Sequence, residues 1–136
     1  MEFNTQICTN KEQSKRLIDL GLNPNTSDMH HYRWWEGCWD IQNCPPRGSD
    51  SCFIPAWSLH RLIAMLPNKI EWVSVIPSRI SYYQPVFYKN RIEYTDMEGL
   101  RHVFCNKDNI YDNIIDCIKW LIKKNYFNKE YLKKEE

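Results

Sequence analysis

The sequence has few glycines and no long apolar run, and both shortages limit what the protein can do. Only 4 of its 136 residues are glycine. Neither a P-loop nor a G-x-G-x-x-G pattern occurs, so we do not expect a backbone loop that cradles phosphates. The apolar runs fall far short of the ~20 residues that span a bilayer. The net charge is +1, which gives no strong signal for nucleic acid or for an anionic membrane.

The sequence also lacks a regular cysteine motif, since its six cysteines are irregularly spaced and form no C-x-x-C pair. The first residues lack the basic and apolar regions of a signal peptide. We therefore expect a cytoplasmic protein whose thiols stay reduced. Zinc-ligand residue types occur in one polar stretch, at His30, His31, Cys38, Cys44 and Cys52. Their spacing matches no structural zinc pattern, so we predict no metal and no cofactor and keep these five as weak candidates.

Catalytic motifs are absent as well, because the chain has no G-x-S-x-G, H-E-x-x-H or EF-hand pattern. His102 and Cys105 are close in sequence but would face opposite sides of a strand. Asp112 and Asp116 are four residues apart on a predicted helix, where exposure to solvent explains them. The sequence therefore predicts that the protein is not an enzyme, with a metal- or thiol-dependent enzyme as the third alternative.

Aromatic residues are abundant, at 14% of the chain with six Trp and eight Tyr. Aromatic faces stack on flat ligands, arginine pairs with phosphate, and Trp, Tyr and Arg anchor many protein interfaces. Neighbours on an extended strand alternate faces, so Trp34 and Trp35 cannot both enter one core. The alternative is that the aromatic rings pack over sheet edges and the central helix. The predicted ligand- or partner-binding residues are Tyr32, Arg33, Trp34, Trp35, Trp39, Tyr83, Tyr88 and Arg91.

Apolar periodicity predicts three helices. The central one covers residues 54–66, with Pro55 in its first turn and Pro67 after its end. The first covers residues 11–20, with Thr9 as N-cap, Glu12 completing a capping box and Gly21 as the stop. The last begins at an Asp108 cap and ends before Asn125, which suits the left-handed position after a helix.

Short alternating segments predict strands between the second and third helices. They cover residues 71–76, 80–83, 86–88, 92–95 and 100–105, with an interruption at Pro85 and turns at 89–91 and 96–99. Residues 42–51 are rich in turn residues and are expected to form an exposed loop. The predicted fold is α+β, a single domain over residues 1–131 with three helices on a small antiparallel meander. Residues 132–136 are expected to be a frayed, charged tail.

Three segments resemble a group of small proteins from Bacteroides genomes, prophages and phages, a group with no established activity. They are residues 8–22 with Thr26-Ser-Asp-Met29, the run Ile54-Pro-Ala-Trp-Ser-Leu59, and the closing residues 112–126. The aromatic stretch from Arg33 to Cys52 lies outside the resemblance. The resemblance implies an intracellular accessory protein of a mobile element, located in the host cytoplasm if a phage encodes it.

Together these features predict a non-enzymatic accessory protein with an aromatic and basic binding surface. Its predicted partner is a small ligand, such as a nucleotide, or a host protein. With either partner, a role in counteracting host defence is an expected function. The alternative is a structural interaction module that forms a homodimer through its aromatic surface or a strand edge. No membrane partner is expected.

Overall fold

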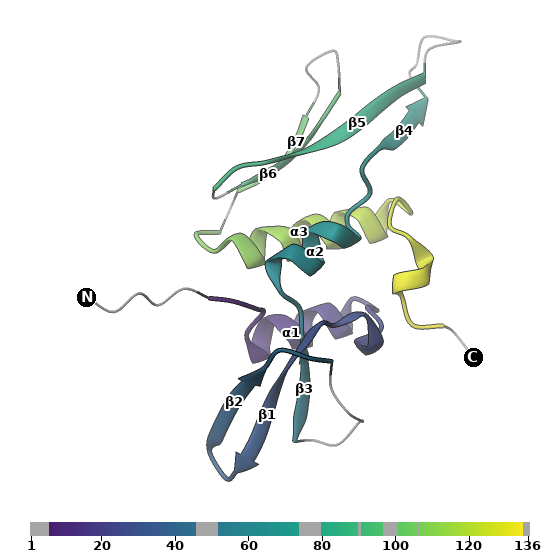
Figure 1. The fold of residues 1–136 in the computed structure, drawn as a ribbon. Helices are drawn as coiled ribbons and strands as arrows, with labels where there is room; N and C mark the ends of the chain where they lie inside the picture. Colours follow the sequence, from purple (N-terminus) through teal and green to yellow (C-terminus); the bar gives the residue numbers. More distant parts are fainter. Residues whose placement is uncertain are drawn as a thin grey trace. The chain divides into compact units, whose positions relative to one another are not determined.

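The computed structural model describes residues 6–45, 52–73, 80–89, 91–96, 101–105 and 107–134. Helices and antiparallel sheets make up this part of the chain, which confirms the predicted α+β class (Figure 1). Contacts group the chain into a first unit, residues 1–65 with 129–136, and a second unit, residues 66–128. The sequence analysis made no such division. No described helix has the length and apolar character needed to cross a bilayer.

The first unit contains a three-stranded antiparallel sheet with its longest strand in the middle. The strand order is β2 (Cys38–Gln42), β1 (Met29–Trp35) and β3 (Phe53–Ala56). Along β1 the first three residues are buried and the last two are exposed. The buried end of β1 therefore belongs to the core of the first unit, and its other end reaches solvent.

Helix α1 (Lys11–Asp19) contacts β3 in the same unit. Its N-cap is Asn10, whose side chain forms a capping box with Gln13, so the predicted Thr9 cap is wrong. Thr9 is instead completely buried. The predicted stop is confirmed: Gly21 has a φ of +107°, and the amides after the helix donate back to Ile18 and Leu17 in a Schellman motif.

The predicted helix over residues 54–66 is wrong in its first turn. Phe53–Ala56 form strand β3, and α2 covers only Leu59–Met65. Ser58 begins this helix, because its carbonyl accepts from Leu62 N and its hydroxyl from Arg61 N. Pro55 sits on β3 at the edge of the sheet, where a residue without an N–H is tolerated.

The second unit contains a four-stranded antiparallel sheet in sequential order. Its strands are β4 (Ile70–Val73), β5 (Ile80–Phe87), β6 (Ile92–Thr95) and β7 (Arg101–Phe104). The predicted interruption at Pro85 is wrong, because β5 runs through this residue. Pro85 pairs with Tyr94 on β6 and lies beyond Tyr83, where the pairing with β4 ends. Residues 46–51, 74–76 and 97–100 of the predicted loop, strands and turn lie outside the described residues.

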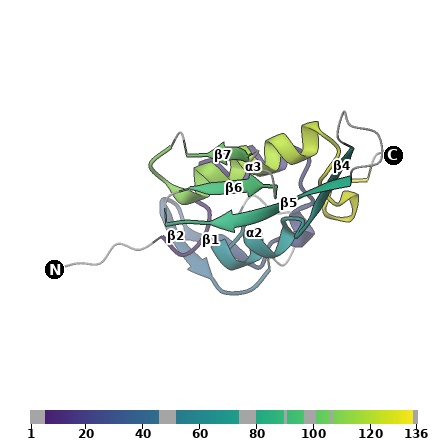
Figure 2. The ribbon, with the colours of Figure 1, turned by 90° about the horizontal axis from the view of Figure 1, so that it is seen from above.

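Helix α3 (Ile110–Lys123) covers one face of this sheet, as Figures 1 and 2 show. Trp120 on α3 packs against Tyr94, His102 and Phe104 on the sheet. The cap is Asn109 rather than the predicted Asp108, and its side chain accepts from two amides of the first turn. Asn125, with a φ of 61°, closes a second Schellman motif, which confirms its predicted place.

The first unit also contains two short 3-10 turns, η1 (Pro24–Thr26) and η2 (Lys129–Tyr131), and the chain re-enters this unit at η2. Leu132 forms an antiparallel bridge with Leu22. The amide of Lys133 donates to the carbonyl of Gly21 at 2.8 Å. The segment expected to fray thus begins with two residues that are held by backbone hydrogen bonds.

Candidate functional site

The first aromatic group lies on the β1–β2 hairpin of the first unit. Trp34 and Trp35 stand at the end of β1, and 56% and 70% of their respective surfaces are exposed. The turn that follows is Glu36–Gly37, and Gly37 has a φ of +79°, which glycine adopts at little cost. The hairpin therefore presents two large aromatic side chains to solvent next to a tight turn.

The pairing of the two strands changes register beside these tryptophans. Arg33 pairs with Trp39 and Trp35 pairs with Cys38, so β1 carries one extra residue at this point. Such an irregularity breaks the alternation of faces that the sequence analysis assumed for Trp34 and Trp35. Neither tryptophan enters a core, and the bulge sets the direction of both side chains.

The rest of the first group packs within the hairpin and onto neighbouring elements. The ammonium of Lys11 lies 3.9 Å from the ring centre of Trp39, and the guanidinium of Arg33 lies 5.7 Å from the same ring. Tyr32 stacks on Phe53 of β3 with ring centres 5.2 Å apart. Trp39 and Tyr32 are thus structural contacts of the sheet, and the free aromatic surface is that of Trp34 and Trp35.

Four of the five weak metal candidates, His30, His31, Cys44 and Cys52, have polar side-chain contacts. His30 Nδ1 donates to the carbonyl of Cys44 at 2.6 Å, and Nε2 of the buried His31 donates to the carbonyl of Thr9 at 2.8 Å. Each of these nitrogens must carry the proton, because a carbonyl oxygen only accepts hydrogen bonds. Cys52 Sγ lies 3.9 Å from a guanidinium nitrogen of Arg33. Within the described residues no three His, Cys, Asp or Glu side chains gather closely enough to hold a metal.

The six cysteines form no disulfide, and Cys8 and Cys117 are buried. Burial, reinforced by the charge of Asp116, raises the pKa of the Cys117 thiol well above its usual value. Burial, followed by the charge of Asp28, also raises the pKa of Cys8. A raised pKa keeps both sulfurs protonated and weakly nucleophilic near neutral pH. Cys105 is the exposed thiol among the six.

The second predicted group belongs to the second unit and is divided by the structure. Tyr83 is buried, and its ring meets the edge of His102 with centres 5.3 Å apart. Burial is the largest cause that raises the pKa of Tyr83, followed by the charges of Asp96 and Tyr126. Tyr88 is exposed, and the guanidinium of Arg91 lies 3.9 Å from its ring centre. Tyr83 is therefore part of the core, whereas Tyr88 and Arg91 share a surface.

This surface is hollowed into a cavity of about 620 Å³. The lining residues come from the β5–β6 turn and from the chain between β7 and α3: Tyr88, Lys89, Arg91, Cys105, Lys107 and Asp108. Sequence reasoning missed Cys105, Lys107 and Asp108 as site residues. The pairing of Ile92 with both Phe87 and Phe104 brings the β5–β6 turn next to the chain that follows β7. No local sequence pattern predicts that pairing.

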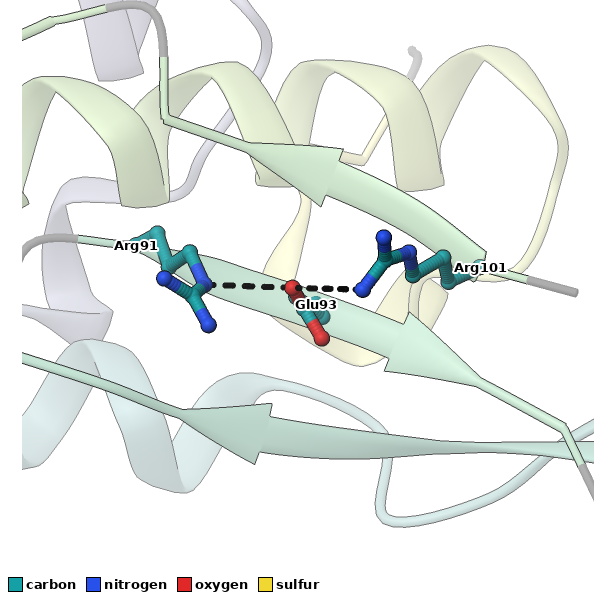
Figure 3. Close-up of polar contacts among 3 residues, drawn as sticks. All are labelled: Arg91, Glu93 and Arg101. Carbon is teal, nitrogen blue, oxygen red and sulfur yellow. Dashed lines mark hydrogen bonds and ion pairs between the residues drawn. The ribbon is translucent and has the colours of Figure 1, made fainter. Parts of the chain in front are cut away.

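A buried carboxylate lies beside this cavity. Glu93 is on β6, two residues after Arg91, and its side chain is only 5% exposed. Its Oε1 accepts from Arg91 Nε at 3.1 Å and pairs with Arg101 Nη1 at 3.8 Å, as Figure 3 shows. Tyr94, the next residue, faces Trp120 of α3, so Glu93 and its arginines lie on the other face of the sheet.

No family model, curated protein or solved structure matches this chain. The candidate surfaces must therefore be judged by their own geometry. Three segments of the first unit meet in a polar network built on Thr9, Asp28 and Trp57. Thr9 N donates to the carbonyl of Trp57, Trp57 N donates to Thr9 Oγ1, and Ser58 N donates to Asp28 Oδ1. Thr9 and Trp57 are completely buried, so this network belongs to the core of the unit.

Proposed function

We propose that the protein is a non-enzymatic accessory protein that binds a host protein through the end of its β1–β2 hairpin. The main support is the exposure of Trp34 and Trp35, which leaves two of the largest apolar side chains in water. Tryptophan is the residue type most enriched at the energetic centres of protein interfaces. The resemblance to phage and prophage proteins supplies the context, in which a stoichiometric action on a host factor is the natural role.

The geometry around the two tryptophans also suits an interface. Lys11 of α1 and Arg33 of β1 lie beside the ring of Trp39 on β2, so the same unit carries two cations next to the hairpin. Apolar centres with polar rims are typical of interfaces between proteins that also exist apart. A short hairpin held by a sheet needs little ordering on binding, so little conformational entropy is lost.

The test compares three tagged proteins in capture experiments from host lysate: the natural chain, a Trp34→Ser/Trp35→Ser variant, and an Ile7→Ser control. Ile7 is 54% exposed in the same unit, so the control removes exposed apolar surface from a residue that is not part of the hairpin. We expect a host protein that the natural chain and the control retain and the double variant loses. With the purified partner, each Trp→Ser change should weaken binding at least about thirtyfold, or about 2 kcal/mol.

Equal capture by the double variant and the natural chain would show that the hairpin is not the interface. Sedimentation of the same three proteins tests the homodimer alternative. If the natural chain and Ile7→Ser dimerise and the double variant stays monomeric, the occupant of the hairpin is a second copy of this chain. That result would replace the host protein by a homodimer.

A further inference from the structure

The cavity in the second unit has a lining with an excess of positive charge. Lys89, Arg91 and Lys107 contribute three cations and Asp108 one anion, which leaves a formal charge of +2. Among the described residues neither Lys89 nor Lys107 forms an ion pair. The whole chain has a net charge of only +1. The positive charge of this cavity is thus a local feature that the overall composition conceals.

The side chain of Arg91 is fixed in this lining by two contacts. Its Nε donates to the buried Glu93 carboxylate, and its guanidinium lies over the ring of Tyr88. These contacts hold the planar group in one orientation, and within the part of the chain that the structure describes neither terminal nitrogen has a hydrogen-bond partner. An arginine with two free terminal nitrogens matches the oxygens of a phosphate, and prior fixation reduces the entropy lost on binding.

The attraction for anions comes from side chains and not from the end of α3. The Asn109 side chain accepts from the amides of Tyr111 and Asp112, and the amide of Lys107 donates to Asn113 Oδ1. These amides therefore have partners already. A volume of about 620 Å³ lies within the roughly 300–1,000 Å³ of small-molecule sites.

We propose that this cavity binds a small organic phosphate, with Arg91, Lys89 and Lys107 around the phosphate group and Tyr88 beside the organic part. Glu93 acts as a positioning residue, since it orients Arg91 and does not line the cavity. The site lies in the second unit and is independent of the protein partner proposed for the hairpin. Either proposal can fail without affecting the other.

The structure supplies a matched pair of variants for the test. Arg91 and Arg101 both pair with Glu93, but only Arg91 lines the cavity. Titration calorimetry with ADP, and with adenosine as the uncharged control, should detect binding of ADP alone. Arg91→Gln should weaken ADP binding at least about tenfold, as expected for the loss of a charge-assisted hydrogen bond. Arg101→Gln should change it less than about threefold, because its charge is screened by solvent.

Lys107→Gln provides a second variant, because this exposed lysine can be changed without disturbing Glu93. It should also weaken ADP binding. Cys105 gives a local readout: ADP, or inorganic pyrophosphate as a second probe, should slow its alkylation by iodoacetamide, followed by mass spectrometry of peptides. Cys38, in the first unit, is the internal control and should react at an unchanged rate.

Three results would overturn the proposal. One is that adenosine binds as tightly as ADP, since the phosphate would then contribute nothing. Another is equal weakening by Arg91→Gln and Arg101→Gln, which would indicate a general charge effect. The third is that neither ADP nor pyrophosphate slows the alkylation of Cys105, which would place any binding elsewhere.

Discussion

The replacement of Thr9 by valine should destabilise the first unit without changing its packing volume. Thr9 is completely buried. Its hydroxyl oxygen accepts from Trp57 N at 3.1 Å and lies 2.7 Å from the hydroxyl of Ser14, which is also completely buried. Valine has nearly the same shape but offers no hydrogen bond. The substitution therefore isolates the polar contribution of one hydroxyl.

The magnitude follows from the groups that lose a partner. The amide of Trp57 has no other hydrogen bond among the described residues, and a buried donor without a partner costs about 1–3 kcal/mol. The Ser14 hydroxyl loses its contact as well, which adds about 1 kcal/mol. Thr9→Val should thus lower the free energy of unfolding by about 2–4 kcal/mol, a large part of a typical stability of about 5–15 kcal/mol.

Urea unfolding followed by circular dichroism measures this loss. With an m-value of about 2 kcal/mol/M, the midpoint should fall by about 1–2 M. Ser14→Ala should cost only about 1 kcal/mol, because Trp57 keeps its acceptor. The Thr9→Val/Ser14→Ala double variant should be about 1 kcal/mol more stable than the sum of the two single effects predicts, because no serine is left without a partner. A shift below about 0.5 kcal/mol for Thr9→Val, or strictly additive effects, would refute the assigned network.

Two further predictions concern a backbone conformation and a buried thiol. Gly21→Ala should lower the free energy of unfolding by about 1–2 kcal/mol through backbone strain alone, because at the φ of +107° an added Cβ meets only Leu132 Cδ2, at 4.0 Å. Asn125→Gly is the control and should change the free energy of unfolding by less than about 1 kcal/mol. An equal loss in both variants, measured by urea unfolding, would contradict this explanation. Burial raises the pKa of the Cys117 thiol above its usual 9.0, so the unfolded chain loses this proton first and stability, constant below about pH 9, falls as the pH rises further. Cys117→Ala should reduce that decline between about pH 9 and pH 10.5, and an unchanged slope would show that this thiol does not cause it.

The candidate site could be predicted only in part from the sequence. Aromatic and basic residue types singled out Trp34, Trp35, Tyr88 and Arg91, all of which the structure places at a surface. The same residue types also singled out Tyr83, which is buried. Composition does not tell a core tyrosine from a surface one, since both pack on aromatic neighbours. Lys107 and Cys105 were missed because strand register, and not local pattern, brings them to the β5–β6 turn.

The sequence by itself determined those features that depend on neighbouring residues. The apolar periodicity of α3, the left-handed positions at Gly21 and Asn125, and the strand over residues 92–95 follow from the local sequence, and the structure has all of them. The α+β class follows from the order of such elements. Local rules failed where two neighbouring residues could both serve, as at the N-caps of α1 and α3, each of which lies one residue from its predicted place.

Only the tertiary structure decided features that need a distant partner. The sequence around Pro55 predicts the start of a helix, but Phe53–Ala56 pair with strand β1. The backbone hydrogen bonds of this pairing stabilise the segment more than one additional helical turn would. The same physics divides the chain into two units, buries Glu93 under two arginines and leaves Trp34 and Trp35 in solvent. Strand pairing acts between residues far apart in the chain, so no pattern within a short segment can specify it.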